Sequence, residues 1–403
     1  MIDYLMLLAF IFSPFYLWQS GLPQISHIIA AVAICLRVLL RPRFYWERLW
    51  GLGAAFVLYS YLVGLIIFAK YKDVHTILSP TYYAFGFMIF LFLITLCKEK
   101  GSAFLTKIFW IHFIALFFVT MLGILGIGRM FGQARIIATF NDPNQMANWI
   151  LWATIIIGVS GKALYRSWLP GGVSLIPASV GIAFTASRSG ALGLFSLFAV
   201  YGLIGFYYLF RYILTKERIN LVRGIIFGLF IIAVGIGIGF TYDFWQEDLK
   251  RITFQAEYLF ERFNERDLDD TFEGRGYDRI WKFPEYLIFG AGEGAHERYA
   301  ERTRFLGEFH SSWAGLLFNY GMVGTFLFFG FVFVILLRIS DIWFKLMLLS
   351  PFIYGFTTYN IRNWYFWVGL ALLYSSYQVL KENKSRDKIK VIFSNVYQYM
   401  VEH

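Results

Sequence analysis

Long apolar segments recur along almost the whole chain and are separated by short polar stretches. Many of them approach the roughly 20 residues that an α-helix needs to cross the hydrocarbon core of a bilayer. Because no water bonds the backbone inside lipid, and because these runs are too long and apolar for barrel strands, they predict helices. We expect an all-α, polytopic integral membrane protein with about twelve spans: 3–19, 24–40, 49–69, 77–97, 103–127, 145–161, 168–186, 189–210, 224–243, 311–337, 341–359 and 364–380. Ser13-Pro14 predicts a kinked or short first span, and without a basic N-terminal region or cleavage site we expect it to be retained.

One polar stretch, residues 244–310, interrupts this pattern. It holds fifteen of the 26 Asp and Glu residues and ten of the 36 Lys and Arg residues. Between Trp245 and Phe263, apolar residues recur every three or four positions among charged ones, which predicts an amphipathic helix. The glycine-rich run Gly290–Gly294 predicts a flexible turn, and without a preceding parallel strand or a Lys-Ser/Thr pair it does not predict a nucleotide site.

The chain therefore divides into four parts. We expect nine transmembrane helices in 1–243, the polar loop in 244–310, three more transmembrane helices in 311–380, and a basic tail in 381–403. The tail beyond Ile389 fits either an interfacial helix or a disordered segment.

Composition and charge refine the class of protein. Hydrophobic residues make up 58% of the chain and charged residues 15%, whereas a soluble domain carries roughly a quarter of charged residues. With the N-terminus in the cytoplasm, the inner segments hold twenty Lys and Arg residues and the short outer loops six. This asymmetry predicts that both termini are cytoplasmic and that the polar loop lies outside. The net charge of +10 comes mostly from the inner segments, so it gives no reason to expect nucleic acid as a partner.

Arginines near the outer membrane rim are the first candidates for chemistry. Arg188 lies between two predicted spans with almost no loop around it, where a charge tends to face a cavity or a partner. A snorkelling arginine at a helix end is an equally good explanation. Arg275 and Arg279 lie in the polar loop with helical spacing, and guanidinium groups can hold phosphate oxygens. Salt bridges within the loop explain these two arginines as well.

His310 opens the tenth predicted span. An imidazole at the outer rim can act as a general base because its ordinary pKa lies near neutral pH. Glu308 is its rival for that role, and an interfacial hydrogen-bonded histidine is the plainer alternative. The sequence contains no zinc-protease, cysteine-pair or serine-hydrolase motif, so we expect no metal and no cofactor.

Amide and carboxylate residues gather before the sixth predicted span, at Asn141, Asp142 and Asn144. Helix capping with a proline at the first helical position explains Asp142. The additional amides suit a substrate rich in hydroxyl groups. We therefore expect these three residues, together with Tyr277, Arg279 and Glu308, to bind substrate.

The order of several short motifs resembles the O-antigen ligase and O-antigen polymerase superfamily of bacterial envelopes. The likeness covers most of the chain, and it rests on the order and spacing of the motifs rather than on any one of them. In chain order, the motifs are Ser20-Gly21-Leu22-Pro23-Gln24, Phe140-Asn141-Asp142-Pro143-Asn144, Thr185-Ala186-Ser187-Arg188-Ser189-Gly190, a loop arginine before Phe289-Gly290-Ala291-Gly292, His310-Ser311, and Tyr320-Gly321-Met322-Val323-Gly324.

This resemblance implies a GT-C-like membrane fold and metal-independent, inverting glycosyl transfer in the bacterial inner membrane. Undecaprenyl-pyrophosphate-linked glycans would be donor and acceptor, with chain-length regulator and flippase proteins as possible partners. Arg188 and the loop arginine would bind the pyrophosphate, and His310 would position or deprotonate the acceptor hydroxyl. The family's loop arginine usually lies further before the Gly-x-Gly turn than Arg275 does. We expect Arg275 in that role, with Arg279 as its substitute.

Three functions remain open at this stage. The motif forms favour a polymerase of lipid-linked repeat units over a ligase that transfers the glycan to lipid A-core. A flippase or transporter is the alternative from another class. It would place charged residues within its spans, whereas these spans are nearly free of charge.

Overall fold

The structure is a computed structural model, and it describes residues 2–19, 22–132, 135–215, 242–264, 271, 273–303 and 306–402. Most of these residues are helical, and 6 helices are long and apolar enough to cross a membrane. Shorter apolar helices accompany them. This architecture agrees with the helical membrane protein that the apolar pattern predicts.

The part of the chain before the polar loop is built from helices and one small hairpin. Its elements are α1 (Ile2–Ile11), α2 (Ile25–Leu40), η1 (Arg48–Trp50), α3 (Gly51–Tyr71), α4 (His75–Lys100), α5 (Ser102–Ile124), β1 (Arg129–Phe131), β2 (Arg135–Ala138), α6 (Pro143–Tyr165), α7 (Leu169–Thr185) and α8 (Arg188–Thr215). Strands β1 and β2 pair antiparallel. The described residues are mostly helical, and this short hairpin, between the predicted spans 103–127 and 145–161, departs from the all-α prediction.

The polar loop and the helices after it complete the chain. These elements are α10 (Tyr242–Asn264), α11 (Arg279–Lys282), η3 (Pro284–Tyr286), η4 (His296–Tyr299), α12 (Ser312–Leu337), α13 (Ile342–Leu346), α14 (Leu349–Gly355) and α15 (Trp364–Glu402). Helix α10 confirms the predicted amphipathic helix. The predicted span 224–243 lies outside the described residues, except for its last two residues, which begin α10.

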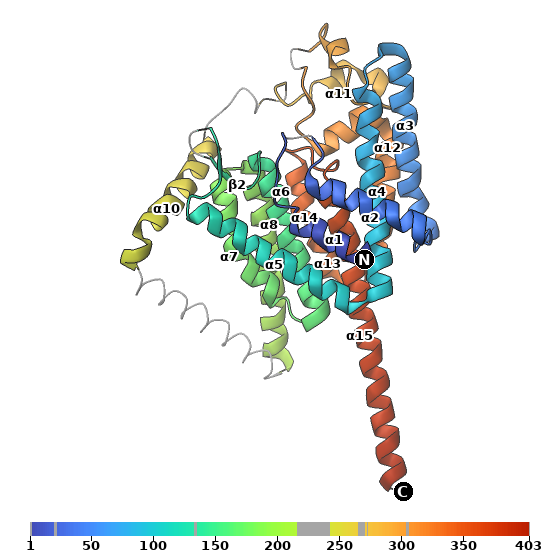
Figure 1. Cartoon of the computed structure of the whole chain (residues 1–403), viewed down its shortest axis with the longest axis vertical. Coiled ribbons are helices and arrows are strands. Elements are labelled where there is room, and N and C mark those ends of the chain that lie inside the picture. Colours follow the sequence, from blue (N-terminus) through green and yellow to red (C-terminus); the bar gives the residue numbers. More distant parts are fainter. Residues whose placement is uncertain are drawn as a thin grey trace.

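Three of the predicted spans differ from the helices that the structure shows. Helix α1 ends at Ile11, before Ser13-Pro14, so the short form of the first span is confirmed. The predicted span 341–359 forms two consecutive short helices, α13 and α14, within one apolar segment rather than one continuous helix. Pro351 stands in the first turn of α14, where a helix tolerates a missing N–H. Helix α15 runs through the tail to Glu402, and it projects away from the bundle as one rod rather than as a separate interfacial helix (Figure 1).

Helix α6 forms the centre of the bundle and is the most buried of the long apolar helices. It packs against α5, α7 and α15, and α15 also packs against α4. Small residues allow these close approaches: a Cβ on Gly369 of α15 would lie 2.0 Å from the Trp152 ring of α6. The remaining helices flank this centre, with α3, α4 and α12 on one side and α5, α7 and α8 on the other (Figure 1).

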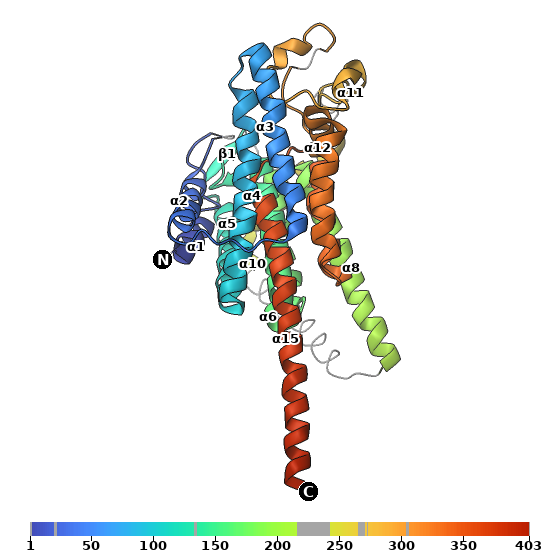
Figure 2. The ribbon, with the colours of Figure 1, turned by 90° about the vertical axis from the view of Figure 1, so that its right-hand side faces the viewer.

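The two ends of the bundle differ in character. The helices of the polar loop around α11 lie at one end, which we call the loop end, and the C-terminus projects from the opposite, tail end (Figure 2). Helix α10 packs on the outside of α7, α5 and α8. The connections α5–α6, α7–α8 and α14–α15 reach the loop end, where the candidate residues lie.

Candidate functional site

Backbone and side-chain bonds tie the loops together at the loop end. The Arg275 Nη1 donates to the Thr357 carbonyl at 3.3 Å, and the Thr357 Oγ1 lies 2.6 Å from the Ser189 Oγ. The backbone N–H of His310 donates to the Arg275 carbonyl at 3.4 Å. Thr357 thus joins the segment of Arg275 and His310 to the residue that follows Arg188, so three predicted site segments meet around the α14–α15 connection.

Arg188 is the first residue of α8, directly after a tight turn from α7. Ala186 adopts a left-handed conformation with φ 45° at this turn. The Arg188 Nη1 donates to the Arg262 carbonyl at 3.0 Å, and the Arg262 Nη1 donates to the Ala186 carbonyl at 3.2 Å. Helix α10 therefore delivers a second arginine to the turn that carries Arg188.

A third arginine reaches the same turn from the β-hairpin. The Arg135 Nε donates to the Thr185 carbonyl at 2.7 Å. We call Arg135, Arg188 and Arg262 the arginine cluster. Sequence reasoning missed Arg135 and Arg262, because nothing local indicates that the hairpin and α10 fold back onto this turn.

The arginine cluster has an unfavourable electrostatic environment for its own charges. The pKa of Arg135 is lowered to about 10, mainly by burial and also by the neighbouring Arg262 and Arg188, while Asp142 opposes the shift. A guanidinium group keeps its proton at neutral pH even so. The cluster therefore concentrates positive charge that a bound anion would stabilise.

The residues at the start of α6 lie next to this cluster. The Asp142 Oδ1 accepts bonds from the backbone N–H groups of Asn144 and Gln145 at 2.8 and 3.0 Å, so Asp142 caps the helix. The Asn144 Oδ1 accepts a bond from Ser187 at 2.8 Å, and the Asn141 side chain donates to the Trp18 carbonyl. Asn144 thus helps to hold the α7–α8 turn, whereas Asp142 caps α6 and Asn141 bonds the segment after α1. The role of the three residues in binding substrate stays a prediction.

The two loop arginines have different surroundings. Arg275 is half-buried, and its neighbour Tyr277 donates to the Phe356 carbonyl on the same connection. Arg279 is 0% exposed, and its Nη2 donates to the Gly307 carbonyl at 2.8 Å while its guanidinium lies 4.8 Å from the centre of the Tyr299 ring. Arg279 therefore belongs to the interior of the loop, and the geometry favours Arg275 as the loop arginine that a substrate can reach.

The glycine-rich run is a fixed part of the structure, so the predicted flexible turn is wrong. The N–H groups of Ala291 and Gly292 donate to the Phe318 and Asn319 carbonyls of α12 at 2.9 and 2.7 Å. Arg298 also donates to the Gly292 carbonyl at 3.0 Å. The glycines are needed for backbone shape, since Gly290, Gly292 and Gly294 all have positive φ.

Helix α12 is broken where it receives this run. Gly321 has φ 64° and ψ −173°, outside the helical region. The Met322 N–H donates to the Leu287 carbonyl at 2.7 Å and the Val323 N–H donates to the Ile288 carbonyl at 3.3 Å. The loop and the broken helix thus satisfy each other's backbone groups, which is how irregular backbone is tolerated inside a membrane protein.

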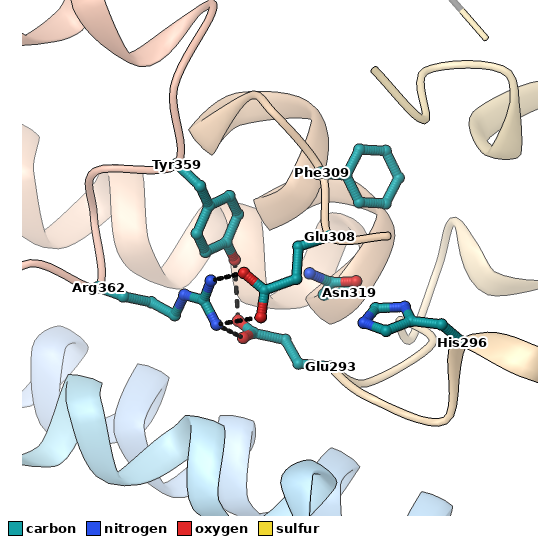
Figure 3. A pocket seen from close by; sticks show the side chains of 7 residues that line it. All are labelled: Glu293, His296, Glu308, Phe309, Asn319, Tyr359 and Arg362. Carbon is teal, nitrogen blue, oxygen red and sulfur yellow. Dashed lines mark hydrogen bonds and ion pairs between the residues drawn. The ribbon is translucent and has the colours of Figure 1, made fainter. Parts of the chain in front are cut away.

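The glycine-rich run places Glu293 between α4, α12 and the α14–α15 connection. The Glu293 Oε1 accepts bonds from the hydroxyl groups of Tyr83, Tyr320 and Tyr359 at 2.7, 3.0 and 2.8 Å. The Arg362 Nη1 donates to the other oxygen, Oε2, at 3.0 Å. Arg362 also donates to both carboxylate oxygens of Glu308, as Figure 3 shows.

We call Glu293, Glu308, Arg362 and the three tyrosines the carboxylate cluster. Sequence reasoning found only Glu308 of its members. Glu293 was hidden in the glycine-rich run, and Arg362 looked like one of six outer-loop charges. One signal could have identified Arg362: it is a charged residue between the last two predicted spans, just as Arg188 lies between two spans.

The charges of the carboxylate cluster control the state of Glu308. Burial acts to raise its pKa, but Arg362 outweighs burial by charge and hydrogen bonding, and His296 and His310 add to it, so the pKa of Glu308 lies below its usual value. Glu308 is therefore an ionised carboxylate at neutral pH, and His310 is close enough to affect its charge.

Within the described ranges, no three His, Cys, Asp or Glu side chains are grouped so as to hold a metal ion. Arginine side chains and Lys282 supply cations at the loop end.

Comparison with protein-family models and with curated proteins finds no match to this chain. The functional argument therefore rests on the residues of the loop end.

Proposed function

We propose that the protein is a membrane glycosyltransferase that polymerises undecaprenyl-pyrophosphate-linked oligosaccharide repeat units into a surface polysaccharide. In this proposal the chain has twelve spans and both termini in the cytoplasm, and the loop end faces the periplasm of the bacterial inner membrane. The observation that supports it most directly is the gathering of Arg188, Arg135 and Arg262 at one turn. Arg275 and His310 are tied to that turn through Thr357.

The arginines fit the leaving group of such a reaction. A donor outside the cytoplasm has to arrive activated, and a pyrophosphate on a lipid provides that activation. As the bond between the anomeric carbon and the pyrophosphate oxygen breaks, the electron pair stays on the pyrophosphate. Fixed guanidinium groups stabilise the negative charge that develops there.

His310 fits the acceptor side. The hydroxyl oxygen of the acceptor attacks the anomeric carbon from the face opposite the pyrophosphate, so the configuration inverts. The hydroxyl proton passes to the imidazole of His310, whose ordinary pKa allows it to take a proton near neutral pH. Arg275 contributes a further cation from the backbone segment that also bonds His310.

Reconstitution with lipid-linked repeat units tests this function. The purified full-length protein in liposomes is expected to convert repeat units alone into a ladder of longer glycans. Product formed only when lipid A-core is added would replace the polymerase with a ligase. Movement of the lipid across the bilayer without any new glycosidic bond would refute the enzyme and favour a flippase.

A further inference from the structure

Arg362 links a buried carboxylate to an exposed one. The Glu293 side chain is 6% exposed and the Glu308 side chain 61%, while Arg362 between them is 19% exposed. Surface ion pairs usually contribute little to stability, so stability alone does not explain a connection that runs from the core to an exposed carboxylate. The position of Arg362 between the two carboxylates would instead hold the Glu308 side chain in one orientation.

Glu293 is a rigid anchor for this connection. Its four bonds come from α4, α12 and the α14–α15 connection. A buried carboxylate is stable only when its oxygens are bonded in this way. The hydroxyl groups of Tyr83 and Tyr359 also lie 2.8 Å apart, so two of the side chains that bond Glu293 hold each other in place.

Glu293 holds Arg362 in place, and Arg362 in turn holds Glu308. A guanidinium group that faces a carboxylate with two parallel N–H donors restricts its orientation as well as its position. Arg362 also lies over the Tyr359 ring, 4.5 Å from its centre. Glu308 is therefore held next to His310 while part of its side chain remains accessible.

A small cavity opens beside these charges. It measures about 10 Å³ and is lined by Glu293, Glu308, Arg362, Tyr359, Asn319 and His296, with Phe309 at its side (Figure 3). A space of this size holds about one water molecule or one hydroxyl group. Its polar lining consists of groups that bond sugar hydroxyls.

We propose that Glu308 accepts a hydrogen bond from a hydroxyl group of the acceptor sugar, and that Glu293 and Arg362 are positioning residues that hold Glu308 for this contact. This assignment rests on the proposed glycosyl transfer, in which His310 lies at the reacting hydroxyl. It adds the recognition of a neighbouring acceptor hydroxyl, and it makes Glu293 and Arg362, through their hold on Glu308, determinants of acceptor binding.

Carbodiimide labelling of Glu308 in the full-length protein tests the positioning, because it needs no activity. Mass spectrometry follows the rate at which Glu308 couples to glycine ethyl ester. Glu293→Gln is expected to release Arg362 and to raise that rate about threefold or more, and Tyr359→Phe to raise it less. The matched control is Glu99→Gln, which breaks another arginine–carboxylate pair with two bonds, to Arg37 at 3.0 and 2.6 Å; it should leave Glu308 unchanged. An unchanged Glu308 rate in both Glu293→Gln and Arg362→Lys would overturn the positioning role.

Transfer kinetics test the role in acceptor binding. Glu308→Gln and Glu293→Gln are each expected to raise the KM for the acceptor about tenfold, the scale of a lost bond to a charged group, with the donor KM unchanged. Equal loss in donor and acceptor KM, or a loss of kcat alone, would overturn it. If the wild-type protein forms no glycosidic bond, the proposed function fails, and the labelling result still decides whether Glu293 positions Glu308.

Discussion

Arginine side chains at the loop end have three kinds of surroundings, and these determine what each can do. Arg362 is held by two carboxylates. Arg279 is enclosed by aromatic rings and donates to a loop carbonyl. Arg188 lies beside two further arginines, where the charges repel one another. An anion bound beside these three arginines would offset their mutual repulsion.

Replacing Arg188 is therefore expected to affect transfer rather than folding. Arg188→Ala should lower kcat/KM by about 10²-fold or more, the usual effect of removing one group that stabilises developing charge. Arg188→Lys should recover little, because an ammonium group cannot form two parallel bonds to phosphate. Initial rates of repeat-unit transfer measure both variants.

The matched control for this experiment is Arg302→Ala. Arg302 lies in the polar loop, with its side chain 55% exposed and in an ion pair with Glu285. Its replacement should change the rate less than about twofold, as expected for an exposed pair. Equal activity of Arg188→Ala and Arg302→Ala would remove Arg188 from the site.

The lowered pKa of Glu308 predicts a pH dependence of stability. A carboxyl group with a lowered folded-state pKa stabilises the fold fully above its unfolded pKa, here near the usual value of 4.5. This contribution is lost as the pH falls through the folded pKa. In thermal unfolding in detergent, the wild-type melting temperature should decline below pH 4.5 more steeply than that of Glu308→Gln. Parallel curves for the two proteins would contradict the pairing with Arg362, and Glu301→Gln in the same loop should follow the wild type.

The sequence identifies those residues of the loop end whose immediate neighbours make a charged side chain unexpected or point to chemistry. Arg188 stood out because it lies between two apolar spans, and Glu308 because it lies beside His310. Arg135 and Glu293 gave no such signal, since a hairpin and a glycine-rich run carry them to their partners. Their surroundings depend on contacts between segments far apart in the sequence.

At the scale of elements, the length of an apolar segment predicts a helix. It does not predict where the backbone hydrogen bonds of that helix are replaced by bonds to another segment. The run of α12 is apolar throughout, so it reads as one span, yet Gly321 breaks it. The freed carbonyls of Phe318 and Asn319 accept bonds from the glycine-rich run. Hydropathy does not record which backbone groups pair, so neither the break nor its partner could be predicted.

Gly321→Ala is expected to destabilise the protein by about 1–3 kcal/mol, the cost of a side chain in such a backbone conformation. A Cβ there would also lie 2.3 Å from the Ile288 carbonyl oxygen. Gly330→Ala in the same helix is the control, because its Cβ would meet only a Leu52 side-chain atom at 3.3 Å. Thermal unfolding of both variants in one detergent compares them. A melting temperature for Gly321→Ala equal to that of Gly330→Ala would show that the break is not required.

At the scale of the whole molecule, the two ends carry different kinds of charge. The loop end holds the arginine and carboxylate clusters. The opposite end carries basic side chains such as Lys100 and Lys162 in the last turns of α4 and α6, and Lys381 within α15. Basic residues of this second kind favour the cytoplasmic side of a membrane. The charge distribution therefore supports a loop end that faces outward.

Cysteine labelling in intact cells tests this orientation. In a background with Cys35→Ser and Cys97→Ala, Glu301→Cys reports on the loop end and Lys384→Cys on the exposed start of the tail. A membrane-impermeant maleimide should label Glu301→Cys directly and Lys384→Cys only after the inner membrane is permeabilised. The opposite pattern would place the loop end in the cytoplasm, where the proposed lipid-linked chemistry does not fit.

The mutual bonding of the glycine-rich run and α12 also has a consequence for the order in which the protein is made. Residues 287–292 leave the ribosome before α12, and Glu293 leaves before Tyr320, Tyr359 and Arg362. A growing chain is therefore expected to hold Glu293 without its cation until the segment ahead of α15 has emerged. Assembly of the carboxylate cluster is thus expected late in biogenesis, so a chain truncated before Arg362 should insert its earlier helices and still lack a finished loop end.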